Sequence, residues 1–193
     1  NSGSIKIGGV DVRDIPKDEL MNTVSFVFQN SRLIKASILD NVKMGKSNAT
    51  DEEVLNALRA AQCMDIIEKF PDGVNTVIGS RGVYLSGGEM QRIALARAIL
   101  KDAPIVLLDE ATAFADPDNE YLIQLAFEKL VEGKTVIMIA HRLSTVRSAN
   151  AIMVLEQGRV IERGSHDELI AQKGKYYQLY NGCLLYTSPS PRD

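Results

Sequence analysis

Residues 86–109 read SGGEMQRIALARAILKDAPIVLLD, and this stretch decides the fold class. Ser86 is a good N-cap for a helix that we expect to run to about Leu100. The run IVLL at 105–108 is apolar throughout, which is typical of a strand covered on both faces of a parallel sheet. The stretch therefore predicts an α/β fold.

Strand and helix signals alternate on both sides of this stretch. TVSFVF at 23–28 has the alternation of a strand, and IKIGGVDV at 5–12 suggests a hairpin. After residue 109 we expect a helix with Asp116 as its cap and Pro117 at its first position. Its buried face is predicted at Leu122, Leu125 and Ala126. TVIMIA at 135–140 and the segment 151–155 predict two more strands, with another helix between them.

Helical signals dominate residues 36–100. A capping box at 50–53 precedes apolar residues on one helix face, at Val54, Leu55, Leu58 and Ala61. We interpret this block as a helical subdomain inserted into the sheet.

Gly87 and Gly88 stand directly before the charged start of the helix. Adjacent glycines lower helix propensity, which indicates a requirement for bare backbone at this point. With the Ser86 hydroxyl, the free N–H groups of a helix N-terminus suit a terminal phosphate. A capped helix with a flexible entry is the structural alternative.

Polar residues follow the ends of three predicted strands. Asp109 and Glu110 come after 105–108, His141 after 135–140, and Gln29 after 23–28. Ligands bind at the carboxyl edge of open parallel sheets. If a nucleotide binds at this edge, Asp109 would hold Mg²⁺ through the ion's coordination shell, and Glu110 would orient or deprotonate an attacking water.

The sequence has no complete phosphate loop of the form G-x-x-x-x-G-K-[ST]. The stretches ending at Ser47 and Thr135 imitate its last residues, but the position of the first glycine holds Asp40 and Glu128. We expect both to be ordinary turns.

Together, these motifs resemble the nucleotide-binding domain of an ATP-binding-cassette transporter, of the type fused to an exporter-fold membrane domain. The likeness covers about residues 3–180. The residues that carry it are Gln29, Leu85-Ser86-Gly87-Gly88-Glu89 with Gln91-Arg92, IVLLD with Glu110, Asp116, His141 and the stretch 141–170.

The resemblance implies a RecA-like P-loop NTPase fold with ATP and Mg²⁺ as cofactors. The core would comprise about residues 1–35 and 101–182 and the helical subdomain about 36–100. By the resemblance, Glu110 would be the catalytic carboxylate and His141 the switch histidine. Ser86, Gly87 and Gly88 would form the signature, with Glu89 where Gln is usual. Asp116 would be the D-loop residue, and Gln29 and Asp109 would contact Mg²⁺.

Such domains pair head to tail, so the signature of one contacts ATP held by the other. The chain's own P-loop would lie upstream of Asn1, and its absence should expose apolar sheet surface. The implied partners are a second ATPase domain, identical or not, and a transmembrane domain, which places the chain at the cytoplasmic face of the plasma membrane. Ser80 stands where exporter-type members often carry an acid that contacts the membrane domain.

Composition excludes several other classes of protein. The chain has 193 residues and a net charge of −3, without a basic run suited to nucleic acid. Cys63 and Cys183 have neither disulfide nor zinc spacing, and no apolar run is long enough to span a bilayer. The last residues, 183–193, differ in composition from the rest, and we expect a non-native tail there.

Two alternatives stay open at this point. One is a soluble cassette ATPase acting on ribosomes or chromosomes, although residues 30–84 are too short for a long coiled coil and lack heptads. The other is a pairing module that does not hydrolyse ATP, which a chain that truly begins at Asn1 would fit.

Overall fold

The computed structural model describes residues 3–28, 32–79, 83–109, 117–140 and 143–187. They fall into two compact units, residues 1–139 and 140–193. Each unit is described by itself below.

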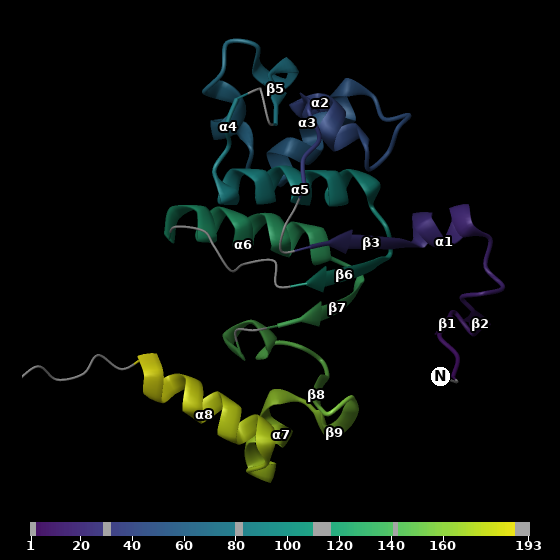
Figure 1. Ribbon diagram of the computed structural model, residues 1–193, viewed down its shortest axis with the longest axis vertical. Coiled ribbons are helices and arrows are strands. Elements are labelled where there is room, and N and C mark those ends of the chain that lie inside the picture. Colours follow the sequence, from purple (N-terminus) through teal and green to yellow (C-terminus); the bar gives the residue numbers. More distant parts are fainter. Residues whose placement is uncertain (1–2, 29–31, 80–82, 110–116, 141–142, 188–193) are drawn as a thin grey trace, which may run out of the picture. The chain divides into compact units, whose positions relative to one another are not determined.

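A three-stranded parallel sheet lies at the centre of the first unit (Figure 1). The strand order is β3-β6-β7, and both neighbouring pairs are parallel. The strands are β3 (Val24–Val27), β6 (Ile105–Asp109) and β7 (Thr135–Ile139). The predicted α/β fold with a parallel sheet is confirmed.

Helices α5 (Gly87–Lys101) and α6 (Pro117–Val131) connect these strands. Both connections step across the sheet in the same direction, and right-handed crossovers then place both helices on one face. On that face Val27, Val106 and Leu108 are buried in one cluster with residues of both helices. The predicted buried face of α6 is partly wrong, because Ile123, Ala126 and Leu130 are buried whereas Leu122 and Leu125 are half-buried.

The opposite face of the sheet is apolar and exposed. Register places Phe26, Leu107 and Ile137 in one row on this face. Phe26 and Phe28 stack on each other, and Ile137 and Ile139 are each more than half exposed. The exposed apolar sheet surface that we expected is therefore present.

The helical block packs on α5 and includes a small sheet that the sequence did not predict. Its helices are α2 (Ile38–Lys43), α3 (Asp51–Ala60), α4 (Met64–Glu68) and the 3-10 turn η1 (Gly73–Asn75). Strands β4 (Ala36–Ser37) and β5 (Val77–Ile78) pair antiparallel at its edge. The capping box at the start of α3 is confirmed, because the side chains of Thr50 and Glu53 each accept the other's backbone N–H.

The amino-terminal segment forms the expected hairpin, with β1 (Lys6–Ile7) paired antiparallel to β2 (Val10–Asp11), followed by α1 (Lys17–Thr23). Both imitations of a phosphate loop are turns. Met44 ends α2, and Gly133 has a positive φ of 70° in the turn before β7.

The second unit corrects two predictions. Strand β8 (Ile152–Glu156) pairs antiparallel with β9 (Arg159–Gly164), a strand that the sequence analysis missed. The 3-10 turn η2 (Leu143–Val146) stands where a helix was expected. Gln157 and Gly158 have positive φ angles, as a two-residue hairpin turn requires, so local turn chemistry determines this pairing.

Two helices complete the second unit, α7 (His166–Gln172) and α8 (Lys175–Thr187). Its core contains Ile152, Val154, Leu169 and Tyr176. The non-native tail was expected to begin at residue 183, but helix α8 continues past this residue. The tail therefore stays a prediction. Among the described helices of both units, none is long and apolar enough to cross a membrane.

Candidate nucleotide site

The three parallel strands bring their carboxyl ends to one edge of the sheet. Val27 lies opposite Leu108, and Asp109 lies opposite Ile139. Asp109 is exposed there, so its carboxylate is accessible to a metal ion. The other residues predicted for this edge or the segment after it lie outside the described residues, and their roles stay predictions: Gln29, Glu110, Asp116 and His141.

Helix α5 runs antiparallel to these strands. At its carboxyl end, Lys101 Nζ donates a hydrogen bond of 2.7 Å to the carbonyl of Val24, the first residue of β3. The amino terminus of α5 therefore lies toward the carboxyl edge of the sheet (Figure 1). The first N–H groups of a helix have no partner within it and carry a partial positive charge, so this end favours an anion.

A capping box fixes the start of α5. Ser86 Oγ accepts a hydrogen bond of 3.2 Å from the Glu89 N–H, and Glu89 Oε2 accepts one of 2.8 Å from the Ser86 N–H. Ser86 and Gly87 are exposed, which leaves the Ser86 hydroxyl hydrogen and the Gly87 backbone accessible to a ligand, whereas Gly88 and Glu89 are buried. An exposed N–H group at a helix start is the kind of donor that a phosphate uses, so the predicted phosphate contact at this turn stays a prediction.

Glu89 is held inside the chain at the start of α5. Its Oε2 is engaged by Ser86, and its Oε1 forms an ion pair with Lys69 Nζ. Burial alone would raise the pKa of Glu89, but the Lys69 and Ser86 hydrogen bonds outweigh it and hold this pKa below its usual value. Glu89 was predicted to contact nucleotide, and these contacts give it a second role in shaping the first turn.

Gly88 packs closely against the first turn of α6. A Cβ at position 88 would lie 2.9 Å from both Cβ and Cγ of Asn119. Real Cβ atoms do not approach this closely, so a side chain here would push the two helices apart. The second glycine therefore has a packing reason in addition to any contact with phosphate.

Arg92 joins the signature helix to its neighbours, a role that the sequence analysis did not assign. Its side chain is only 1% exposed and makes a bidentate pair with Asp65 of α4, at 2.7 and 2.9 Å. It also donates to the Gln62 carbonyl and, at 3.1 Å, to Asn119 Oδ1. A charged residue among apolar ones in the predicted helix is the sequence signal that could have indicated this network.

Comparison with known proteins identifies the family. Residues 1–113 match the family model for the ABC transporter. The chain belongs to the ABC transporter family. The predicted resemblance and the P-loop NTPase fold class are thereby confirmed.

Relatives in the ABC family share long stretches with the chain. It is 46% identical over 179 residues to the mycobactin import ATP-binding/permease protein IrtA of Mycobacterium tuberculosis, covering 93% of this chain and 21% of that protein. It is 44% identical to the ATP-dependent lipid A-core flippase of Desulfotalea psychrophila, covering 93% and 31%. It is 46% identical to the β-(1→2)glucan export ATP-binding/permease protein NdvA of Agrobacterium vitis, covering 96% and 31%. The chain thus spans about a fifth to a third of the length of these curated relatives.

Among the described residues of this ABC domain are side-chain and backbone groups of the chemical types that bind Mg²⁺ and phosphate. Asp109 offers the hard carboxylate oxygen that Mg²⁺ prefers, and the first turn of α5 offers N–H groups to a phosphate. Among the residues that the structure describes, no three acidic, histidine or cysteine side chains gather into a metal site. In proteins, Mg²⁺ usually keeps waters and phosphate oxygens among its ligands beside one or two carboxylates.

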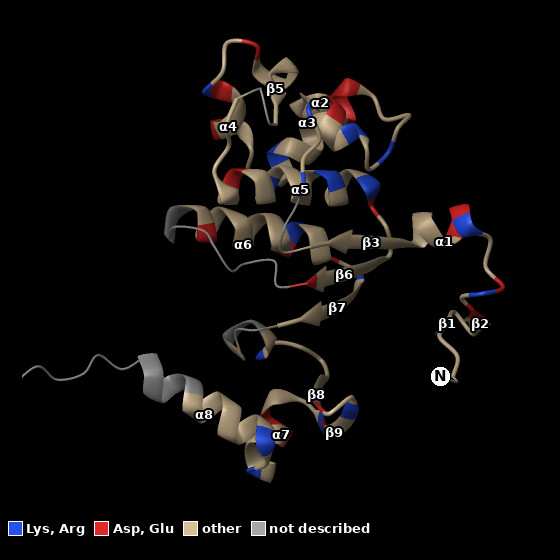
Figure 2. Ribbon diagram, viewed as in Figure 1, with Lys and Arg blue, Asp and Glu red and all other residues tan. Residues whose placement is uncertain are grey.

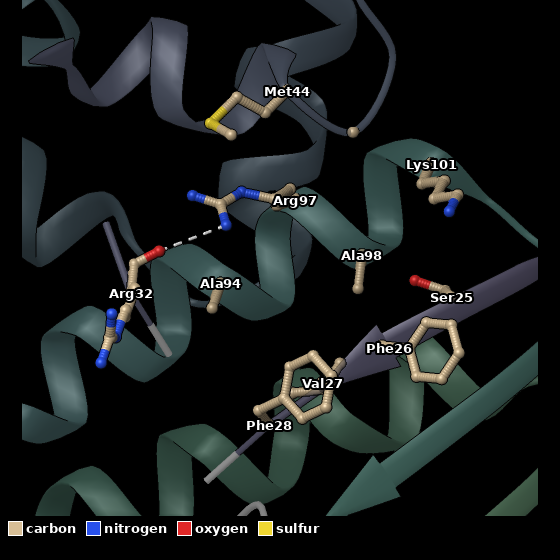
Figure 3. A pocket seen from close by; sticks show the side chains of 11 residues that line it. Ser25, Phe26, Val27, Phe28, Arg32, Met44, Ala94, Arg97, Ala98 and Lys101 are labelled. Atoms are coloured by element: carbon tan, nitrogen blue, oxygen red, sulfur yellow. Dashed lines mark hydrogen bonds between the residues drawn. The ribbon is translucent and has the colours of Figure 1, made fainter. Parts of the chain in front are cut away.

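A pocket of about 480 Å³ lies between β3, the end of α2 and α5 (Figure 3). Apolar side chains of Phe26, Phe28 and Met44 share its lining with the basic side chains of Arg97 and Lys101. Lys and Arg recur along α5, with an acidic residue at its start (Figure 2). Burial lowers the pKa of Arg97 and of Lys101, and hydrogen bonds to backbone carbonyls hold both cations in place.

Proposed function

We propose that this chain is the ATP-binding and ATP-hydrolysing part of an ABC transporter that moves a substrate across a membrane. The observation that supports this best is the shared direction of two phosphate-compatible features. Asp109 and the capped Gly-Gly start of α5 lie toward the same end of the sheet. In a head-to-tail pair of domains, Asp109 serves this chain's own nucleotide, and the start of α5 serves the partner's nucleotide.

In this proposal the chain's residues act by positioning and electrostatics. Mg²⁺, when bound, would neutralise charge on the phosphates, with Asp109 and Gln29 near it. Ser86, Gly87 and Gly88 would bind the terminal phosphate of the partner's ATP. Glu110 would orient or deprotonate the attacking water, His141 would contact the γ-phosphate, and Asp116 would lie at the interface of the pair.

We infer that the chain works with a transmembrane domain at the cytoplasmic face of a membrane. Two of the relatives are named ATP-binding/permease proteins, and this chain matches only a fifth to a third of their length. That supports a transporter over a soluble cassette ATPase of ribosomes or chromosomes. The chain also keeps the Asp109-Glu110 pair and His141, which disfavours a pairing module without hydrolysis.

The experiment that tests the proposal uses the full-length protein in lipid vesicles. We expect Mg²⁺-dependent ATP hydrolysis by the wild type and at least a hundredfold loss in Glu110→Gln, since no carboxylate then activates the water. The same variant should still form an ATP-dependent pair of domains, detected by cross-linking. Hydrolysis by Glu110→Gln at the wild-type rate would refute the assignment of Glu110.

A further inference from the structure

The first turn of α5, which would meet the partner's ATP under the proposed function, carries a buried negative charge. Glu89 is the acidic residue of this turn and is 9% exposed (Figure 2). Burial alone would raise its pKa, but hydrogen bonds from Lys69 and Ser86 hold this pKa below its usual value, so the carboxylate is charged at neutral pH. A charge of this sign opposes a phosphate at the same turn.

Lys69, the residue that ends α4, balances this charge. Its Nζ lies 2.5 Å from Glu89 Oε1, while Glu89 Oε2 accepts the Ser86 N–H. Both carboxylate oxygens are therefore engaged inside the chain. The Lys69 side chain is still 53% exposed, so its cation reaches solvent.

The neighbouring ion pair offers no further positive charge to the start of α5. The guanidinium of Arg92 is already matched by the carboxylate of Asp65 in a bidentate pair. Two acids and two bases thus balance in the group formed by Asp65, Lys69, Glu89 and Arg92. Removal of the Lys69 cation would leave this group with one negative charge in excess.

We propose that Lys69 is a positioning residue that acts through Glu89: it neutralises this carboxylate and so lets the start of α5 accept the terminal phosphate of the partner's ATP. This inference rests on the proposed function. Without Lys69, the carboxylate would repel the phosphate. Charges that a paired domain shields from water interact more strongly than charges in bulk water, so the repulsion would be felt at the site.

Helix α3 has the same local arrangement without a proposed nucleotide. Its capping-box residue Glu53 accepts the Thr50 N–H through Oε2 and pairs through Oε1 with Lys46 Nζ at 2.6 Å. The side chains of this pair are 43% and 42% exposed. A lysine that only supports a capping box would therefore have the same role in both helices.

The test measures steady-state ATP hydrolysis by full-length variants in lipid vesicles at about 0.1 M and about 0.5 M salt, since salt shortens the reach of charges. We expect Lys69→Met to lower kcat/KM about tenfold relative to wild type at the lower salt, and less than about threefold at the higher salt, because ions screen the unbalanced carboxylate. Lys69→Arg, which keeps the cation, should stay within about threefold of wild type at both.

Glu89→Gln completes a double-mutant cycle. In the Glu89→Gln background, Lys69→Met should change kcat/KM less than about twofold, because no carboxylate is left to balance. Lys46→Met is the matched control on α3, and it should stay within about twofold of wild type at both salt concentrations.

The role of Lys69 would be overturned by a wild-type kcat/KM in Lys69→Met, by a loss that does not shrink with salt, by an equal loss in Lys46→Met, or by an undiminished loss in the Glu89→Gln background. In each case the wild type still hydrolyses ATP, so the proposed function stands. Absence of Mg²⁺-dependent hydrolysis by the wild type would instead refute the proposed function and, with it, this inference.

Discussion

Helices α5 and α7 begin with the same local device and have different surroundings. Each starts with a Ser-x-x-Glu capping box, in which Glu89 and Glu168 both accept the serine N–H at 2.8 Å. Glu89 is buried against Lys69, whereas Glu168 is exposed. The two residues inside the box are Gly-Gly in α5 and His166-Asp167 in α7. The comparison teaches that a capping box by itself marks only a helix start, and that the two glycines and the neighbouring helix α6 set the start of α5 apart from that of α7.

The largest expected difference comes from a valine at the third position of each box. Gly88→Val should displace α6 through Asn119 and lower ATP turnover by about a hundredfold or more, since overpacking and a misplaced cradle act together. Asp167→Val, at an exposed position, should leave turnover within about twofold. Steady-state ATP hydrolysis by the full-length variants measures both. Equal losses in the two variants would contradict the comparison.

An intermediate difference is expected from removing the capping hydroxyls. Ser86→Ala and Ser165→Ala should each cost their helix start about 1 kcal/mol, because the same acceptor is lost. Only Ser86→Ala should also lower kcat/KM for ATP, by about tenfold or more, since its hydroxyl is also a phosphate donor in the proposed site. Hydrogen exchange of the two first turns reports the local stability, and hydrolysis reports the rate. A matching rate loss in Ser165→Ala would show that the effect is only structural.

The smallest expected difference is one of pH dependence. The ion pair with Lys69 and the Ser86 N–H hold the pKa of Glu89 below its unfolded value, so their contribution is present above about pH 4.3 and is lost as pH falls through the folded pKa. Glu89→Gln should therefore weaken the start of α5 at pH 7, and its effect should shrink as pH falls through the folded pKa of Glu89. The pKa of Glu168 is lowered mainly by the Ser165 N–H, and no lysine of the described residues pairs with Glu168, so Glu168→Gln should have a smaller effect.

Local stability of both helices, from hydrogen exchange corrected for intrinsic pH effects, measures this last difference. Lys69→Met provides the control, because it removes the partner without altering the capping box. If Glu89→Gln and Glu168→Gln weakened their helices equally at pH 7, the ion pair with Lys69 would contribute nothing at the start of α5.

Much of the fold was predictable because its signals are local. The apolar run before Asp109, the capping boxes at Thr50 and Ser86, and Pro117 at a helix start each depend on neighbours within a few residues. The prediction failed where pairing partners decide the outcome. Strand β8 has the apolar character of a parallel strand, yet the Gln157-Gly158 turn pairs it with β9.

By itself, the sequence determined the family and the alternation of helix and strand from α5 to β7, because the motifs from Ser86 to Asp109 are contiguous and specific. It also indicated a phosphate at Gly87 and Gly88, since adjacent glycines at a helix start need a reason. Only the tertiary structure decided that Gly88 also provides close packing against Asn119, and that Arg92 joins three helical segments. These contacts bridge about 30 residues of chain on either side of α5. No local pattern encodes such separations, because the partners meet only when the helices pack.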